Sequence, residues 1–289
     1  MKQISRPWVL AVILGLGVIA GCQTVQTTAP GVVGVNRQQH VSPLINRDQL
    51  NQQATLQYQQ VLKEADGKRQ LNQDAAMLAR VRRIADRIIP QVKTFRPEAA
   101  SWKWEVNVIK SDELNAWCMP GGKIAFYSGL IEQLKATDDE LAQVMGHEIA
   151  HALREHAWER ASKSATAGLG ISILGAGEAH IDMASMVYNV TFELPNSREH
   201  ETEADRIGIE LAARAGYDPR AAVTLWQKMG KASGSSSSPK WLSTHPASTE
   251  REQDLRYYGD LVMPLYGAGT QALIHPLTQG NELETRRIG

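Results

Sequence analysis

A His-Glu-x-x-His motif at residues 147–151 constrains this chain more than any other sequence feature. In an α-helix, positions i and i+4 lie on one face, so His147 and His151 can offer two imidazole nitrogens to a single zinc ion. Glu148 lies about 100° round the helix, from where its carboxylate can reach a water on the metal without being a ligand. The motif therefore predicts a site that activates water for hydrolysis.

The residues around the motif predict the helix that it requires. Thr137 and Glu140 form the pattern of a capping box, which starts a helix. An apolar stripe at helical spacing follows, made of Leu141, Val144, Met145, Ile149 and Ala152. We expect this helix to run to about Lys163. On it, His156 falls roughly 180° from His147, so we interpret His156 as an ordinary helix histidine.

A catalytic zinc ion needs three protein ligands, and the motif supplies two. The third candidate is Glu201, in a segment predicted to be a helix over residues 198–215. Asp205 lies four residues further on the same face and can accept a hydrogen bond from a ligating imidazole. Glu199 and Glu203 are rivals for the third ligand, and spacing alone does not decide among the three.

The remaining pattern predicts an α+β fold that is mostly helical, with a small antiparallel sheet. Alternating aromatic and β-branched residues predict strands over 102–109, 115–119 and 123–127, with a turn at 120–122 between the second and third. Helical periodicity or capping signals predict further helices over residues 46–65, 72–92, 130–135, 219–231 and 249–258.

The N-terminus predicts export and lipid attachment. Lys2 and Arg6 precede an apolar run over residues 8–20, which is the length of a signal-peptide core. The run ends in Ile-Ala-Gly-Cys22, which resembles a bacterial lipobox; an ordinary signal peptide is the alternative. Gln23 follows, and by resemblance to enterobacterial sorting signals it favours the outer membrane.

These features divide the chain into four predicted parts. They are a lipoprotein signal peptide (1–21), a flexible tether (22–45), a zinc metallopeptidase domain (46–260) and a C-terminal tail (261–289). The 31 basic and 31 acidic residues balance, so we expect a membrane contact through lipid on Cys22 and no nucleic-acid partner.

The two metal segments together resemble a gluzincin. Glu201-Thr-Glu-Ala-Asp205 is similar to the zinc peptidase family that contains the CAAX prenyl proteases, HtpX and Oma-type proteases. Residues 115–130 and the segment Thr244-His245-Pro-Ala-Ser248 resemble further parts of that family. Within it, the chain is most similar to periplasmic lipoprotein members such as LoiP and BepA, without the helical-repeat domain of BepA-like proteins.

The resemblance implies a gluzincin-type domain that hydrolyses peptide bonds. It implies one zinc ion held by His147, His151 and Glu201, with Glu148 as the general base. It also implies that an extended peptide binds along a strand edge at Asn115, Ala116 and Trp117.

His245 stays open at this point. It is a transition-state stabiliser, an inhibitory fourth zinc ligand, or a plain loop histidine. The function that we expect is an endopeptidase that cleaves unfolded or misassembled envelope proteins at the periplasmic face of the outer membrane. The alternatives are a non-proteolytic chaperone with a capped or structural zinc site, and hydrolysis of a cell-wall bond.

Overall fold

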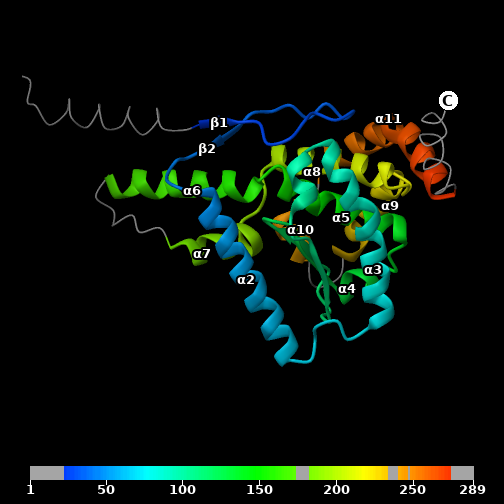
Figure 1. The fold of residues 1–289 in the computed structure, drawn as a ribbon, viewed down its shortest axis with the longest axis horizontal. Helices are drawn as coiled ribbons and strands as arrows, with labels where there is room; N and C mark the ends of the chain where they lie inside the picture. The colour runs from blue at the N-terminus through cyan, green and yellow to red at the C-terminus, as the bar shows by residue number, and fades with distance from the viewer. Residues whose placement is uncertain (1–22, 174–181, 234–239, 247, 275–289) are drawn as a thin grey trace, which may run out of the picture.

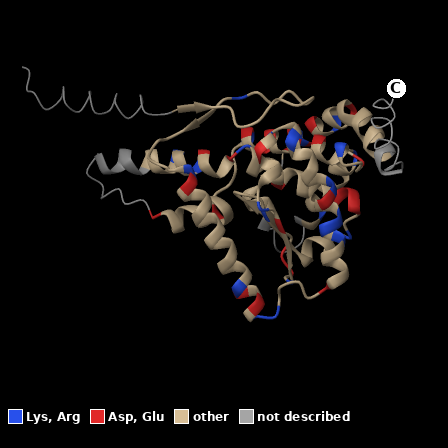
Figure 2. Cartoon of the chain, viewed as in Figure 1, with Lys and Arg blue, Asp and Glu red and all other residues tan. Residues whose placement is uncertain are grey.

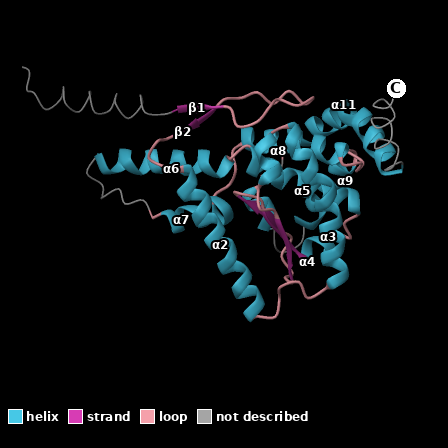
Figure 3. Ribbon diagram, viewed as in Figure 1, coloured by secondary structure: helices cyan, strands magenta, loops and turns pink. Residues whose placement is uncertain are grey.

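A computed structural model describes residues 23–173, 182–233, 240–246 and 248–274. The predicted signal peptide and Cys22 lie outside these residues. The described chain is mostly helical with small sheets (Figure 3), which confirms the predicted fold class.

Helix α5 (Asp138–Leu153) carries the motif and lies at the centre of the molecule (Figure 1). The predicted capping box is confirmed, because the Thr137 hydroxyl accepts from the Glu140 amide while the Glu140 carboxylate accepts from the Thr137 amide. Helix α5 is buried from Glu140 to Leu153 and contacts α3 (Ala75–Ile88), α8 (Arg198–Arg214), α9 (Ala221–Ser233) and a sheet strand. A helix surrounded in this way holds its polar residues in fixed positions within the core.

The sheet beside α5 has three strands in the order β3-β5-β4. Strand β4 (Ala116–Met119) pairs antiparallel with β5 (Lys123–Tyr127), as the turn between them predicts. Strand β3 (Glu105–Ile109) runs parallel to β5, so the sheet is mixed. Strand β4 is an edge strand of this sheet, and α5 packs against it.

The other elements surround this centre. Before the sheet lie β1 (Gln23–Val25), β2 (Gln39–Val41), α2 (Arg47–Gly67) and the 3₁₀ turns η1 (Ile89–Thr94) and η2 (Pro97–Ser101). After it lie α4 (Ser128–Gln133), α6 (His156–Ile173), α7 (Met183–Tyr188), the π-helical turn η3 (Asn189–Glu193), α10 (Lys240–Thr244) and α11 (Thr249–Ile274).

Helices α5 and α8 meet backbone to backbone. A Cβ atom built on Gly146 would lie 2.5 Å from the carbonyl oxygen of Gly208, and one built on Gly208 would lie 2.6 Å from the amide nitrogen of His147. Neither distance is tolerable, so only glycine fits at both positions. This crossing brings the start of α8 next to the histidines of the motif.

The motif helix ends earlier than the sequence predicts. Helix α5 stops at Leu153, and α6 begins at His156. Between them Glu155 has a φ of 52°, a left-handed conformation that costs a non-glycine residue about 1–3 kcal/mol. Its carboxylate pairs with Arg47 at 2.7 Å and Arg96 at 3.0 Å, and these contacts from distant segments stabilise the break.

The N-terminal segment, residues 23–45, differs from the flexible tether that its composition predicts. Strands β1 and β2 pair antiparallel, and Val33, Val35 and Val41 are buried against the rest of the chain. Hydrogen bonds from Val33 to Glu210 and from Ala29 to Phe95 join the segment to the helical body. A composition that is polar overall does not predict that these few residues are buried.

The predicted C-terminal boundary also differs, because α11 continues through residue 261 to Ile274. Within the described part of the chain, no helix combines the length and apolarity needed to cross a bilayer. Acidic and basic residues are interspersed along the described helices (Figure 2).

Candidate metal centre

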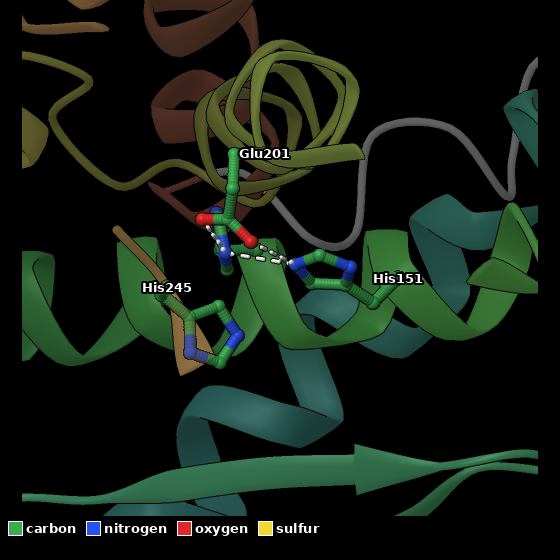
Figure 4. A group of neighbouring side chains, drawn as sticks. His151, Glu201 and His245 are labelled. Carbon is green, nitrogen blue, oxygen red and sulfur yellow. Dashed lines mark hydrogen bonds and ion pairs between the residues drawn. The ribbon is translucent and has the colours of Figure 1, made fainter. Parts of the chain in front are cut away.

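Four buried side chains place their donor atoms at one point above α5. They are His147 and His151 of α5, Glu201 of α8, and His245 immediately after α10 (Figure 4). One ligand atom from each lies within 4.8 Å of the others. The Nε2 atoms of His147 and His151 are 3.0 Å apart, and the Glu201 carboxylate lies 3.5 Å and 3.3 Å from them.

These residues fit a zinc ion. Bonds of about 2.0–2.1 Å in a tetrahedron place neighbouring donors roughly 3.3–3.4 Å apart, close to the separations observed here. Imidazole nitrogens with a carboxylate are a donor set that zinc prefers. Among the described residues, Glu201 Oε1 is buried without a hydrogen-bond partner, which is costly unless a cation binds it. The cluster could therefore hold one metal ion.

The structure separates the three rivals for the third ligand. Glu201 faces the motif histidines, whereas Glu199 is exposed to solvent. Glu203 points to the other side of α8, where it pairs with Arg154 at 3.0 Å. Glu199 and Glu203 each lie two residues from Glu201, a turn of about 200° around α8, so they point away from the α5 histidines when Glu201 faces them.

Asp205 lies where the sequence predicts it, beside a histidine of the motif. Its Oδ1 atom is 2.9 Å from His147 Nδ1, so the imidazole can donate there and keep the Nε2 lone pair for a metal. Burial opposes ionisation of Asp205, but Arg251 and the bond from His147 outweigh it and lower the carboxyl pKa to about 2.

Arg251 of α11 is a site residue that the sequence analysis missed. Its guanidinium donates to both oxygens of Asp205, at 2.7 and 2.8 Å, and lies 2.8 Å from Glu201 Oε2. It also lies over the ring of Trp226, 4.2 Å from the centroid. One arginine therefore fixes both Glu201 and Asp205, and nothing in its local sequence distinguishes it from an exposed helix residue.

Glu148 lies buried beside the cluster. Its Oε1 atom accepts a hydrogen bond from the indole of Trp241 at 2.9 Å and lies 3.4 Å from His245 Nε2. Burial raises the pKa of the Glu148 carboxyl to about 7, with His147 and Trp241 opposing the shift. A carboxyl that titrates near neutral pH suits proton transfer in both directions. Trp241 gave no signal in the sequence.

His156 is not the isolated helix histidine that an uninterrupted helix predicts. Because α5 ends at Leu153, the new helix turns His156 back toward the centre. Its Nδ1 atom lies 2.8 Å from His151 Nδ1, and its Nε2 atom lies 3.0 Å from Glu203. The interpretation of His156 as an ordinary helix histidine was therefore wrong, and its cause is the break at Glu155.

The expected substrate strand and the metal cluster share one cleft of about 400 Å³. Residues that line it include Asn115, Ala116 and Trp117 at the β4 edge, together with Glu148, His151 and His245. An extended peptide that paired with this edge would lie in the same cleft as Glu148, His151 and His245.

His245 is held with one nitrogen facing the cluster. Its Nδ1 atom lies 3.1 Å from the carbonyl oxygen of Trp241, which can only accept, and 3.0 Å from the hydroxyl of Thr244; a proton that Nδ1 donates to the carbonyl leaves a lone pair on Nε2. The Trp241 ring stacks on the imidazole at 4.6 Å. Burial holds the pKa of His245 well below its usual value, which favours the neutral form.

A mostly helical α+β fold, with His147 and His151 on one helix and Glu201 on a second, defines a gluzincin-type metallopeptidase domain. A model described as peptidase family M48 matches residues 75–258, and the chain belongs to that family. This match also confirms the family resemblance of the sequence.

Relatives include mitochondrial metalloendopeptidases called OMA1 and a bacterial protein. The chain is 40% identical to OMA1 of Arabidopsis thaliana over 153 residues, which cover 52% of this chain and 30% of the relative. It is 31% identical to human OMA1 over 227 residues, which cover 73% and 43%. It is 32% identical to the beta-barrel assembly-enhancing protease of Escherichia coli over 170 residues, which cover 55% and 35%. The chain thus spans less than half the length of these relatives.

Proposed function

We propose that this protein is a zinc-dependent endopeptidase. The observation that carries the proposal is the arrangement of His147, His151 and Glu201 around one point, with Glu148 buried beside it. A purely structural zinc site is usually closed by four ligands and has no use for an adjacent carboxylate of raised pKa. Family membership and the metalloendopeptidase relatives support the same activity.

The residues of the chain divide the work of hydrolysis. A bound zinc ion would supply Lewis acidity for the scissile carbonyl and lower the pKa of a water molecule. Glu148 takes the proton of that water and delivers it to the leaving amine, and its pKa near 7 suits both steps. The edge of β4 holds the peptide in an extended form, so we expect unfolded or loop segments as substrates.

The proposed place of action is the periplasmic face of the bacterial outer membrane, with a lipid on Cys22 as anchor. The lipobox-like sequence before Cys22, and Gln23 after it, support this location. The name of the Escherichia coli relative links it to the assembly of β-barrels. We therefore propose unfolded or misassembled envelope proteins, including those of the outer membrane, as substrates.

The activity is tested by changing Glu148 alone. Glu148→Gln is expected to retain zinc and abolish cleavage of casein, because the amide cannot accept the proton of water. Glu132→Gln on the exposed part of α4 is the matched control and should cleave as wild type does. Casein cleavage by the Glu148→Gln protein at the wild-type rate would refute the proposed base.

Location and substrate need separate measurements. Palmitate labelling in cells should mark the wild-type protein and not Cys22→Ser, and unchanged labelling would argue against the proposed anchor. Envelope proteins that are captured by Glu148→Gln and degraded only by wild type would be the substrates. Capture of cytosolic proteins alone would contradict an envelope role.

The position of His245 favours a second candidate, a chaperone whose zinc is capped by four protein ligands. His245 Nε2 offers a lone pair to the cluster, as a fourth ligand would. If His245 caps the metal, His245→Ala should raise basal casein cleavage; if it stabilises the transition state, cleavage should fall. Chelator-sensitive cleavage by wild type excludes the chaperone, whereas an inactive wild type whose His245→Ala variant cleaves casein supports a site capped by His245.

A further inference from the structure

A chain of hydrogen bonds leads from the metal cluster toward the N-terminus of the protein. It begins at His151 Nδ1, passes to His156 at 2.8 Å and reaches Glu203 Oε2 at 3.0 Å. His156 and Glu203 are both buried, so water does not compete for these contacts. His147, the first histidine of the motif, is hydrogen-bonded directly to Asp205. His151, the second, reaches a carboxylate only through His156.

Only one arrangement of protons satisfies this chain when His156 is neutral. The carboxylate of Glu203 can only accept, so His156 carries its proton on Nε2 and leaves Nδ1 as an acceptor. His151 must then donate from Nδ1, which leaves its Nε2 lone pair directed at the cluster. That is the tautomer required of a metal ligand. Glu203 thus sets the orientation of His151 through His156.

The far end of the chain is held by the N-terminal segment. Arg37 donates to Glu203 from Nε at 2.7 Å and from Nη2 at 3.1 Å. The same guanidinium makes two bonds of 2.9 Å to Glu159, so it ties α8 to α6. Its paired bonds to two carboxylates give a fixed geometry that a single ammonium group could not reproduce.

The N-terminal segment also contacts Arg154, the second arginine that pairs with Glu203. Arg154 is fully buried and donates to both oxygens of Glu203, at 3.0 and 3.1 Å. It donates further to the hydroxyl of Thr28 and to the carbonyl oxygen of Arg37. Gln39 donates to the carbonyl oxygen of Arg154, at the end of α5. Three residues of the N-terminal segment therefore meet at the point where the motif helix ends.

We infer that the N-terminal segment is part of the support of the metal centre, with Arg37 and His156 as positioning residues that fix His151 for metal binding. The inference rests on the metal site of the proposed function. It predicts that losing a contact in residues 23–45 weakens zinc binding at a ligand of α5. The segment next to the proposed lipid anchor is thereby coupled to the centre.

Zinc affinity of the purified full chain tests the inference, measured by competition with a chromophoric chelator. Arg37→Met should weaken zinc binding about 10–100-fold, the range typical for the loss of groups that orient a ligand. Arg214→Met is the matched control, since Arg214 has a similar exposure and also pairs with a buried glutamate, Glu210. The control should stay within about twofold of wild type. Equal affinities of Arg37→Met and Arg214→Met would overturn the inference.

Substitution of His156 separates hydrogen bonding from packing. His156→Leu should weaken zinc binding at least as much as Arg37→Met. His156→Gln should restore most of the affinity, because its amide can accept from His151 and donate to Glu203. A glutamine variant as weak as the leucine variant would mean that only packing matters, contrary to the inference.

A measurement on the wild-type protein covers the case that a variant fails to fold. Nitrogen-15 NMR shifts of the histidine rings should show His151 protonated at Nδ1 and His156 at Nε2. His156 protonated at Nδ1 would refute the chain. None of these readouts is proteolysis, so a protein that binds zinc as described and cleaves nothing would contradict the proposed function and leave this inference intact.

Discussion

Replacing Arg251 by methionine should destabilise the protein strongly. Among the residues that the structure describes, Arg251 is the only arginine or lysine that pairs with Asp205, and it makes two hydrogen bonds to that buried carboxylate. Without Arg251, Glu201 would still have a bound zinc ion as its partner, whereas Asp205 would keep only His147 among the described residues. Leaving one buried charge uncompensated costs about 3–5 kcal/mol. For a domain of this size, 1 kcal/mol shifts Tm by roughly 2–4 °C, so Tm should fall by about 6–20 °C.

The assay is thermal unfolding of the zinc-loaded protein followed by circular dichroism. Arg206→Met is the control, because Arg206 of α8 pairs with Asp254 of α11 at the surface. This pair joins the same two helices as Arg251 and Asp205, with the arginine on α8 and the aspartate on α11. Exposed pairs contribute about 0–1 kcal/mol, so the control should lose at most about 4 °C. If both variants lose the same few degrees, the argument that Arg251 neutralises a buried carboxylate is wrong.

Three further predictions concern the metal and the motif helix. Glu201→Ala should weaken zinc binding by more than the roughly 10–100-fold of an outer-sphere change, whereas Glu199→Ala should bind as wild type; the reverse order in chelator competition would reassign the ligand. Zinc at a concentration 1,000-fold above Kd stabilises the folded protein by about 4 kcal/mol. Removing that zinc with a chelator should therefore lower Tm by about 8–16 °C, and an unchanged Tm would mean that the folded protein holds no zinc. Glu140→Gln should lower Tm at pH 7. Burial opposes ionisation of Glu140, but Lys228 outweighs it and lowers the pKa. The contribution of the carboxylate is therefore complete above the ordinary pKa of 4.5 and is lost as the pH falls through the lower folded value, so the Tm gap between variant and wild type should narrow in acid. A gap that widens there would contradict this sign.

The sequence predicted the elements that depend on short-range pattern. The start of α5 follows from Thr137 and Glu140, whose capping box needs only four neighbouring residues. The facing pair Glu201 and Asp205 follows from the spacing of α8 and from the family resemblance. Strand β4 pairs with β5 because a tight turn leaves few other registers.

The features that could not be predicted depend on contacts between distant segments. The break after Leu153 contains neither glycine nor proline, and Arg47 and Arg96 stabilise it from elsewhere in the chain. Arg37 lies in a segment of polar composition, and its two carboxylate partners are more than 100 residues away. Contacts between distant segments produce no periodic pattern in the sequence. The pattern of neighbouring residues therefore predicted a tether for residues 23–45 and placed His156 on the helix face opposite His147.

The contact between Gly146 and Gly208 implies an order in which the metal centre forms. The motif histidines become helical with α5, but Glu201 reaches them only after α8 has docked along the glycine contact. The metal therefore gains its full set of donors from a long-range step, which closes a loop of about 50 residues and is slower than helix formation. A nascent or partly folded chain carries the whole motif and still has no complete zinc site. The proposed hydrolysis therefore requires tertiary docking, and a chain in which α8 has not docked would lack it.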